Sequence, residues 1–377
     1  MRKFLIIGLA VLVAVLGLTA LAGCGGKEET TTTTAAPSTE TTAAPSTETT
    51  AAEGFTPISP PVEVNVAFDD APGTAGIILA DKLGFFEKAG IKVKYTKFNT
   101  GADMYSALAA NKVDVGRGII TASLFNGAAQ GINVWVVADS GTNVPGKGNY
   151  FGIVVRKDLA DQIKDYPDLK GRKILIVSRG SINELFLELA LEKGGLTIDD
   201  VNSTVIDSFP DLNTALGNKA ADVAVQIEPL ITKGVEDGIL VPFPKDAQDY
   251  APGEQVAALL YSSEFAKNTE VARAFMYAYL QGVRAYNDAI VQGDKDRDEV
   301  IKILTENTFV SDPAMWVKMN PTGLNPDGTV LTEAVARDQQ FYMKKGLVEK
   351  EAPIDQVVDN SFAEWASSVL GPYEPPK

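Results

Sequence analysis

Residues 62–98 are VEVNVAFDDAPGTAGIILADKLGFFEKAGIKVKYTKF, a sequence that predicts a strand, a helix and a second strand in succession. Apolar residues dominate Val62 to Phe68, helical spacing follows from Ala75 to Lys88, and Lys92 to Phe98 alternates with the period of two typical of a strand. Two strands joined by a helix form a βαβ unit. The fold class that this segment predicts is α/β.

The same alternation continues along the chain as far as about residue 261. Before a turn at Asp168–Lys173 we expect helices at 103–110 and 121–129 and strands at 113–116, 134–138 and 151–156. After it we expect strands at 174–177, 204–206, 221–226 and 256–261, with helices that end near 192 and lie near 212–216. The remainder is predicted to be helical, at 269–290, 296–306, 333–345 and 362–370.

The N-terminus has the three parts of a bacterial export signal. Arg2 and Lys3 precede an uncharged apolar run from Phe4 to Leu21, and the small residues Ala22 and Gly23 precede Cys24. Leu21-Ala22-Gly23-Cys24 resembles the lipobox at which lipoproteins are cleaved and acylated, so we expect residues 1–23 to be a signal peptide and Cys24 to be the lipid attachment site. The alternative is a cysteine at the end of a retained membrane helix, since the run is nearly long enough to span. Both interpretations place the rest of the chain outside the cytoplasm, at the cell membrane.

Residues 24–61 are expected to form a disordered stalk. Thr30 to Ala52 contains only Thr, Ala, Pro, Ser and Glu, and the octapeptide AAPSTETT occurs twice in tandem from Ala35 to Thr50. Such a segment has no apolar face with which to build a core. We therefore interpret it as a spacer between the membrane and the folded part of the chain.

Composition excludes several classes of function. The chain has 34 basic and 49 acidic residues, and removal of Arg2 and Lys3 with the signal leaves 32 against 49, so a nucleic acid partner is not expected. It has no histidine, and Cys24 is its one cysteine. The commonest general base and the usual ligands of zinc are therefore missing, and we expect no catalytic residues, no metal site and no cofactor. The acidity favours a soluble monomer.

Several short motifs follow one another in a specific order. They are LGFFEKAGI at 83–91, VDVG at 113–116, AAQGI at 128–132, DLKGRKI at 168–174, GGLTIDDV at 194–201, ADV at 221–223 and Glu228-Pro229. Each motif is weak alone, whereas their order and spacing are specific. From Val62 to about Lys345 this order resembles the type 2 periplasmic-binding-protein fold, in the branch that serves importers of nitrate, sulfonate, bicarbonate and thiamine precursors.

The resemblance implies two lobes, each a mixed sheet flanked by helices, joined by two hinge crossings. Lobe 1 would comprise residues 62–167 and 251–377, and lobe 2 residues 168–250. Roughly 320 residues follow the stalk, which exceeds the ~250–300 at which single cores stop growing and agrees with two lobes. A small-molecule solute would sit between the lobes, beyond the carboxyl ends of the strands, and hinged closure would bury it.

The candidate ligand-binding residues are those that follow the predicted strands. They are Phe68, Asp69, Asp70, Thr100, Gly101, Arg117, Ile120, Thr121, Asp139, Ser140, Ser178, Arg179, Gly180, Ser181, Phe209, Gln226 and Glu228.

Two arginines and a helix start suggest an anion site within this set. Ser178-Arg179-Gly180-Ser181 lies between a strand and a helix, where free backbone N–H groups and the helix dipole favour an anion. Arg117 follows a strand of lobe 1 as Arg179 does in lobe 2, which suggests a two-sided clamp on a carboxylate, sulfonate or phosphate. The alternative for Ser181 is a capping box with Glu184, which any helix can use.

Other candidates have structural alternatives of the same kind. Asp69 and Asp70 would accept hydrogen bonds from a ligand or would cap a turn, and their adjacency argues against a catalytic pair. Phe68 and Phe209 would stack on a planar ligand or would belong to the core. Trp135 and Trp316 are expected to be packing residues.

Three functions remain open from the sequence. The favoured one is a substrate-binding lipoprotein that delivers a small anionic or heteroaromatic solute to the membrane permease of an ABC importer. The second is an enzyme like the yeast pyrimidine synthase of thiamine biosynthesis, which shares the fold and consumes its own histidine; the absence of histidine argues against it. The third is a sensor subunit that presents its ligand to a receptor.

Overall fold

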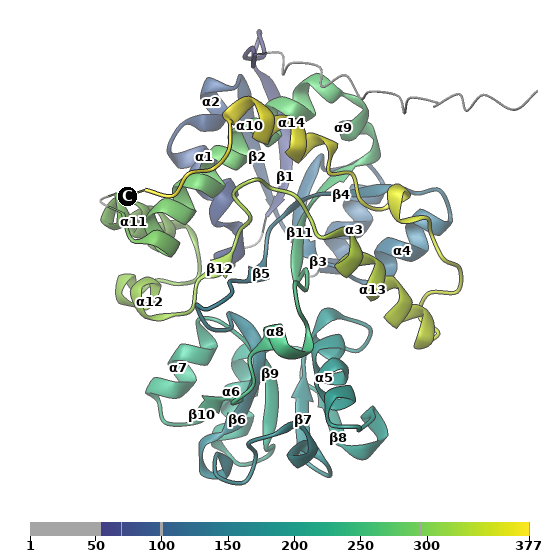
Figure 1. The fold of residues 1–377 in the computed structure, drawn as a ribbon. Coiled ribbons are helices and arrows are strands. Elements are labelled where there is room, and N and C mark those ends of the chain that lie inside the picture. The colour runs from purple at the N-terminus through teal and green to yellow at the C-terminus, as the bar shows by residue number, and fades with distance from the viewer. Residues whose placement is uncertain (1–53, 69, 99–100, 295, 377) are drawn as a thin grey trace, which may run out of the picture. The chain divides into compact units, whose positions relative to one another are not determined.

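Two five-stranded sheets organise the part of the chain that the computed structural model describes, residues 54–68, 70–98, 101–294 and 296–376 (Figure 1). The predicted signal peptide, Cys24 and the tandem octapeptides lie outside the described residues. All of the described residues belong to one structural unit. The predicted α/β class is confirmed.

The first sheet has the strand order β2-β1-β3-β11-β4. Strand β1 pairs in parallel with β2 and with β3, and β11 is antiparallel to both of its neighbours. The strands are β1 Val62–Phe68, β2 Ile91–Lys97, β3 Val115–Ile119, β4 Val134–Asp139 and β11 Ala257–Ser262. The helices that belong to this lobe are α1 Ala75–Lys82, α2 Phe85–Lys88, α3 Gly101–Ala109, α4 Ala122–Ala129, α9 Ser263–Lys267, α10 Thr269–Tyr286, α11 Arg297–Asn307, α12 Pro313–Lys318, α13 Thr332–Lys344 and α14 Ser361–Leu370.

The second sheet has the strand order β10-β6-β9-β7-β8, with β7 parallel to both β8 and β9. Its strands are β6 Phe151–Arg156, β7 Lys173–Ile176, β8 Asn202–Val205, β9 Val223–Ile227 and β10 Leu240–Pro242. Its helices are α5 Ile182–Lys193, α6 Phe209–Gly217, α7 Leu230–Glu236 and α8 Ala247–Tyr250. A two-stranded ribbon of β5 Thr142–Asn143 and β12 Thr322–Gly323 is separate from both sheets.

The strand β6 lies in the second sheet, although the boundary expected at residue 167 assigns it to lobe 1. It pairs antiparallel with β9 and with β10, from Phe151 opposite Ile227 to Arg156 opposite Leu240. The first passage between the sheets therefore comes before residue 151. The DLKGRKI turn at 168–174 lies inside lobe 2, because a turn signal does not tell which sheet the flanking strands join.

Two predicted helices are interrupted. Gly84, with a φ of 74°, separates α1 from α2, where the sequence pattern predicts one helix from 75 to 88. The long helix expected at 269–290 ends at Tyr286 and continues as a π-helical turn, Asn287–Gln292. Both changes fall where the apolar spacing is unbroken, so periodicity alone does not reveal them.

Helices α1 and α10 cross with almost no space between their backbones. A Cβ atom built on Gly282 would lie 2.2 Å from the carbonyl oxygen of Gly76 and 2.6 Å from the backbone nitrogen of Ala80. Glycine at this crossing therefore allows the close approach of the two helices. The surrounding core includes Ile77, Phe275 and Tyr279, all without exposed surface.

Replacing Gly282 by alanine is expected to destabilise the protein by about 1–3 kcal/mol, because the new methyl group forces two backbones apart. Gly217→Ala is the matched control: it is also helical, but the nearest atom to its Cβ would be 3.7 Å away. That change should be neutral or slightly stabilising, as is usual for Gly to Ala in a helix. Denaturant unfolding of both variants measures the difference, and equal stability would contradict the close crossing.

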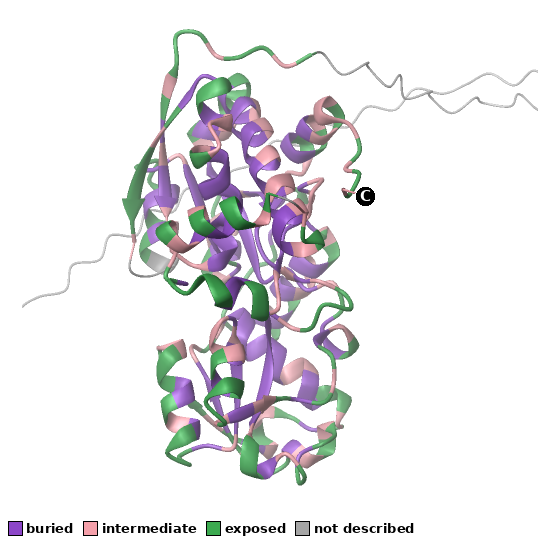
Figure 2. Ribbon diagram, turned by 90° about the vertical axis from the view of Figure 1, so that its left-hand side faces the viewer, coloured by how far each residue is buried: buried purple, intermediate pink, exposed green. Residues whose placement is uncertain are grey.

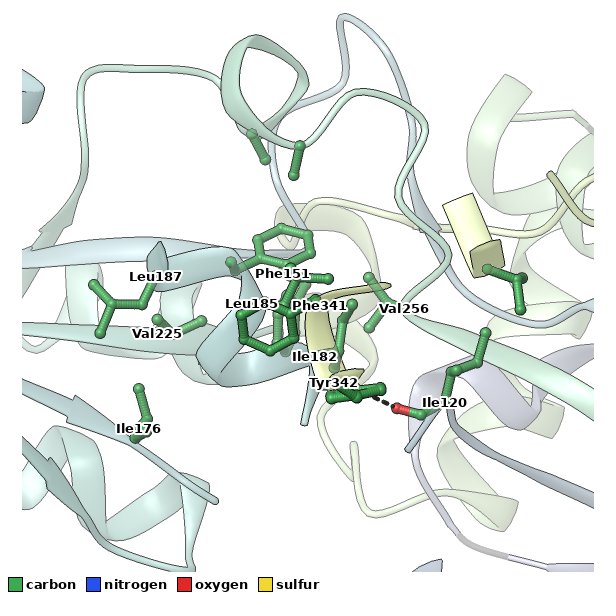
Figure 3. Packing of buried hydrophobic residues seen from close by; sticks show 14 of the residues in the cluster. Ile120, Phe151, Ile176, Ile182, Leu185, Leu187, Val225, Val256, Phe341 and Tyr342 are labelled. Atoms are coloured by element: carbon green, nitrogen blue, oxygen red, sulfur yellow. Dashed lines mark hydrogen bonds between the residues drawn. The ribbon is translucent and has the colours of Figure 1, made fainter. Parts of the chain in front are cut away.

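One apolar core extends through both lobes (Figures 2 and 3). Phe341 and Tyr342 of α13 belong to the same cluster as Ile182 and Leu185 of α5 and Phe151 of β6. Helix α13 also packs against α4, where the ring centroids of Tyr342 and Phe125 lie 5.9 Å apart. It therefore contacts both lobes. In the described residues no helix has the length and apolarity needed to cross a membrane.

Candidate functional site

The two strand-to-helix loops that the sequence singled out meet between the lobes. One follows β3 and leads into α4, and the other follows β7 and leads into α5; Thr121 and Ser181 form an antiparallel β-bridge between them. These loops lie at the carboxyl ends of parallel strands, where open α/β sheets bind ligands. The site predicted from strand order is therefore a place where the two lobes touch.

A cavity of about 520 Å³ opens beside this contact. Its lobe 2 wall consists of Ser178, Arg179, Gly180 and Ser181, and its lobe 1 wall of Ile119, Thr121, Ala122, Ser123, Asn126 and Leu347. Five of the candidate residues thus share one cavity. Asn126 and Leu347 were not anticipated, because nothing in their local sequence connects them to a loop after a strand.

The lobe 2 loop is fixed by one carboxylate, that of Glu184 on the first turn of α5. Its Oε1 accepts a hydrogen bond from Nη1 of Arg179 at 2.8 Å, and its Oε2 accepts one from the backbone N–H of Gly180 at 2.8 Å. The side chain of Glu184 is only 3% exposed. Lys345 approaches the same Oε1 at 3.7 Å and also pairs with Glu188.

The predicted capping box between Ser181 and Glu184 is not formed. Ser181 is the N-cap of α5 but makes no side-chain cap; its Oγ donates to the carbonyl oxygen of Ser178 at 3.1 Å. Glu184 reaches past Ser181 to Gly180 because Arg179 draws its carboxylate toward the loop. The N-terminal end of α5 therefore faces the cavity without a hydroxyl cap, and Thr121 likewise makes no side-chain cap on α4.

The two arginines of the expected clamp do not line the same cavity. Besides Glu184, Arg179 donates to the carbonyl and hydroxyl oxygens of Ser203, at 3.0 and 2.8 Å. Arg117 is buried, donates to the backbone oxygen of Ser140 at 3.2 Å, and lies against Gly73, where a Cβ would come within 2.0 Å of its Nη2. Arg179 lines the cavity described above and Arg117 does not.

Asp139 is a junction between separate parts of lobe 1. Its Oδ1 accepts from the N–H of Gly141 at 2.9 Å and from Nε2 of Gln255 at 2.5 Å, and its Oδ2 accepts from the N–H of Asn325 at 2.6 Å. Burial raises the pKa of this carboxyl group, while the three donors oppose that rise. Asp139 thus connects the end of β4 to Gln255, just before β11, and to Asn325, in the segment before α13.

The lobe 2 candidates from β9 are engaged within the protein. Gln226 is fully buried and donates to the carbonyl oxygen of Phe209 at 2.9 Å and to Oδ1 of Asn213 at 2.8 Å. Glu228 accepts from Thr232 on its own lobe at 2.9 Å and from the N–H of Asn320 at 3.1 Å. Since Asn320 follows α12, Glu228 joins the two lobes at the side of α7 and α12, where Lys318 also pairs with Glu236 at 2.6 Å.

The remaining candidates lie in varied places. Asp70 forms an exposed ion pair with Lys97 at 2.8 Å, and Phe68 packs against Tyr95 with ring centroids 5.1 Å apart. Phe209 is half-buried and contacts the ring of Phe151 edge-on.

The last candidates are buried, begin a helix or lie outside the described residues. Ile120 is buried, and its carbonyl oxygen accepts a hydrogen bond from the hydroxyl of Tyr342 at 3.1 Å. Asp69 and Thr100 are outside the described residues; Gly101 begins α3.

Comparison with known proteins gives the family. Residues 71–289, more than half of the chain, match the model of the family described as NMT1/THI5 like. The chain belongs to the NMT1/THI5-like family. The family resemblance inferred from the order of motifs is thereby confirmed. The matched residues include both loops that line the cavity.

Relatives and solved structures agree with this assignment. A Bacillus subtilis (strain 168) protein, named provisionally as an aliphatic sulfonates-binding protein, is 26% identical over 301 residues, which cover 77% of this chain and 84% of the relative. The periplasmic aliphatic sulphonate binding protein SsuA from Escherichia coli aligns with a TM-score of 0.62 at 21% identity, over 78% of this chain and 91% of that one. The periplasmic nitrate-binding protein NrtA from Synechocystis PCC 6803 aligns with a TM-score of 0.65 at 13% identity, over 82% and 89%.

The fold of this NMT1/THI5-like protein is therefore that of periplasmic binding proteins, and its named relative is a binding protein. The desulfurization enzyme DSZB has the same fold, with a TM-score of 0.59 at 16% identity over 81% of this chain and 98% of that one. The fold alone thus accommodates both binding and catalysis. In the described residues no group of three or more acidic, cysteine or histidine side chains is placed to hold a metal ion.

Proposed function

We propose that this protein is the extracytoplasmic solute-binding component of an ABC importer and that it holds a small organic anion in the cavity beside the Thr121–Ser181 contact. The observation that carries the proposal is the position of the cavity, between loops that follow parallel strands of both lobes. A ligand there touches both lobes, so its binding energy favours the closed arrangement.

The size of the cavity favours an organic solute over an inorganic ion. Its volume of about 520 Å³ falls in the range of roughly 300–1,000 Å³ typical of small-molecule sites. Since a water molecule takes about 30 Å³ of liquid volume, a four-atom anion such as nitrate would fill only a small part of it.

The charge and polarity of the walls favour an acceptor-rich head group. Helices α4 and α5 both begin at the cavity and neither has a side-chain cap, and helix N-termini attract anions. Arg179 and Lys345 are balanced by Glu184 and Glu188, so recognition would rest on backbone amides and on the hydroxyl groups of Thr121, Ser123 and Ser178. Sulfonates and carboxylates satisfy that description.

Delivery to a membrane permease is part of the proposal. It is supported by the likeness to a sulfonate-binding protein from Methylobacillus flagellatus KT that is described provisionally as part of a sulfonate ABC transporter, with a TM-score of 0.64 at 20% identity over 83% of this chain and 96% of that one. The expected acylation of Cys24, which would tether the protein through its stalk, also supports it. Gene neighbours that encode a permease and an ATPase would favour import, whereas a neighbouring receptor would favour the sensor role.

Ligand screening of the purified full-length protein tests the proposal. Thermal unfolding would be measured with organic sulfonates, aromatic acids, nitrate, pyrimidines and flavins. A true ligand present at about 100 times its Kd should stabilise the protein by about 2.7 kcal/mol. The proposal fails if no organic anion raises the melting temperature.

Substitution of Thr121 tests the location of the site. Thr121→Val keeps the shape and leaves the helix cap unchanged, since this hydroxyl makes no cap, but removes a donor from the cavity. A hydrogen bond to a charged group contributes about 1.5–3 kcal/mol, so affinity should fall tenfold or more. Thr214→Val, on the exposed face of α6, is the matched control, and an equal effect of both changes would place the ligand elsewhere.

A further inference from the structure

Two large apolar side chains are exposed inside the cavity. Ile119 is 39% exposed and Leu347 is 41% exposed, and both line the same space. They come from distant parts of the sequence, one from the end of β3 and the other from the segment after α13. Exposed apolar residues scattered singly need no explanation, but a pair that shares one cavity indicates a binding surface.

Leu347 is held in place from several directions. Its carbonyl oxygen accepts a hydrogen bond from Nδ2 of Asn126 at 2.8 Å, and its N–H donates to the carbonyl oxygen of Tyr342 at 2.9 Å. Lys345, two residues earlier, is anchored to Glu184 and Glu188 of lobe 2. The backbone of Leu347 is therefore held within lobe 1, and the nearby Lys345 ties the same segment to lobe 2.

Leu347 also covers the loop that faces the ligand. Gly180 has a φ of 61°, and a Cβ atom there would lie 2.6 Å from Cδ1 of Leu347. Glycine supplies both the left-handed backbone and the space for the leucine. An apolar group thus rests directly on the backbone of the loop that forms the lobe 2 wall of the cavity.

Ile119 is also held by regular structure. It pairs with Ala257 in the antiparallel β3–β11 ladder, and the next residue, Ile120, is buried under Tyr342. The side chain therefore projects from a rigid strand end rather than from a mobile loop.

From this arrangement we infer that Ile119 and Leu347 are specificity-determining residues, which select solutes whose polar head group carries a hydrocarbon portion. The inference deepens the proposed function and rests on it. The head group would meet Thr121 and the Ser178–Ser181 loop, and the hydrocarbon portion would be removed from water against the two apolar side chains that line the same cavity.

A series of ligands that differ only in chain length tests this role. Linear 1-alkanesulfonates from methanesulfonate to octanesulfonate, and the corresponding alkanecarboxylates, would be titrated calorimetrically into the full-length protein. Burial of one CH₂ group contributes about 0.8 kcal/mol, so affinity should rise about fourfold per methylene until the cavity is filled.

The double variant Ile119→Ser/Leu347→Ser should lose most of the gain in affinity per methylene, measured within the variant as the ratio of its affinities for successive members of the series. The matched control is Ile132→Ser/Leu331→Ser, which changes two residues of the same types with exposures of 44% and 49% outside this cavity. The control should keep the fourfold step. All four side chains are partly exposed, and melting curves without ligand confirm that the variants fold.

The outcomes separate the inference from the function on which it rests. An affinity that does not depend on chain length in the unchanged protein, or an unchanged step in the double variant, would overturn the selective role of Ile119 and Leu347 while leaving the solute-binding function intact. The absence of binding by every sulfonate and carboxylate would overturn both.

Discussion

Replacing Asp139 by alanine is expected to lower the free energy of unfolding by about 2–5 kcal/mol. The carboxylate accepts hydrogen bonds from Gly141, Gln255 and Asn325, and all of these groups are buried or partly buried. Gln255 would keep its bond to the carbonyl oxygen of Ala257 at 2.7 Å, but the N–H groups of Gly141 and Asn325 would lose their acceptor. Each unsatisfied buried donor costs about 1–3 kcal/mol.

Asp70→Ala is the matched control, because Asp70 also follows a strand of the first sheet and was an equal candidate for ligand contact. Its carboxylate forms one ion pair with Lys97, in which the side chains are 42% and 63% exposed, so its loss should cost less than about 1 kcal/mol. Denaturant unfolding gives the two values. If Asp139→Ala changed ligand affinity while leaving stability intact, Asp139 would be a ligand contact and its structural role would be wrong.

The pH dependence of stability is expected to be large and to originate in part from two buried acids near the second passage between the lobes. Glu254 precedes β11, and Asp338 on α13 is fully buried beside it. Arg337 forms an ion pair with Glu254, and neither oxygen of Asp338 accepts from a described donor. Burial, followed by the charge of Glu254, raises the pKa of Asp338 well above its usual value.

The direction of the effect follows from the proton count. Burial and the neighbouring charge of Glu254 raise the pKa of Asp338, so the folded protein keeps a proton on this pair of acids that the unfolded chain releases above about pH 4. The contribution of a retained proton to the free energy of unfolding is therefore fully present below about pH 4. It is lost as the pH rises toward the folded-state pKa, by about 1.4 kcal/mol per pH unit for each retained proton. Asp139 and Glu228, whose pKa values burial also raises, act in the same direction.

Asp338→Asn should reduce the slope of the unfolding free energy against pH by the equivalent of about one retained proton, roughly 1.4 kcal/mol per pH unit. Asp338 and Glu254 share a side-chain hydrogen bond, which the amide of asparagine can replace by donating to Glu254. The variant should therefore match or exceed the stability of the unchanged protein at pH 8 and lose that advantage near pH 4.5. Unfolding free energies measured at pH 4.5, 6 and 8 give the slopes. An unchanged slope would show that Asp338 is ionised in the folded protein.

Asp200→Asn provides a control of opposite sign. Hydrogen bonds from Thr197 hold the pKa of Asp200 below its usual value, so its contribution is present above about pH 4 and is lost as the pH falls further. The slope between pH 4.5 and 8 should therefore be unaffected in this variant.

Sequence patterns predicted the α/β class and the strand-to-helix loops because these depend on local periodicity. Thr121 and the Ser178–Ser181 loop were found in this way, since residues after parallel strands gather at one edge of a sheet. The same rule also selected Asp139 and Gln226, which occupy equivalent positions but point into the protein. A residue's place after a strand does not tell whether its side chain faces a cavity or a buried donor.

By itself, the sequence determined the alternation of strands and helices, the motif order of the NMT1/THI5-like family and the absence of histidine. Only the tertiary structure decided that β6 belongs to the second sheet, that Glu184 rather than Ser181 organises the loop, and that Leu347 covers Gly180. Each of these depends on a contact that the local pattern does not encode: between distant strands, between neighbouring charges, or between an exposed leucine and a glycine of the other lobe. Local patterns encode an element, whereas a binding site is made where elements far apart in the chain are packed together.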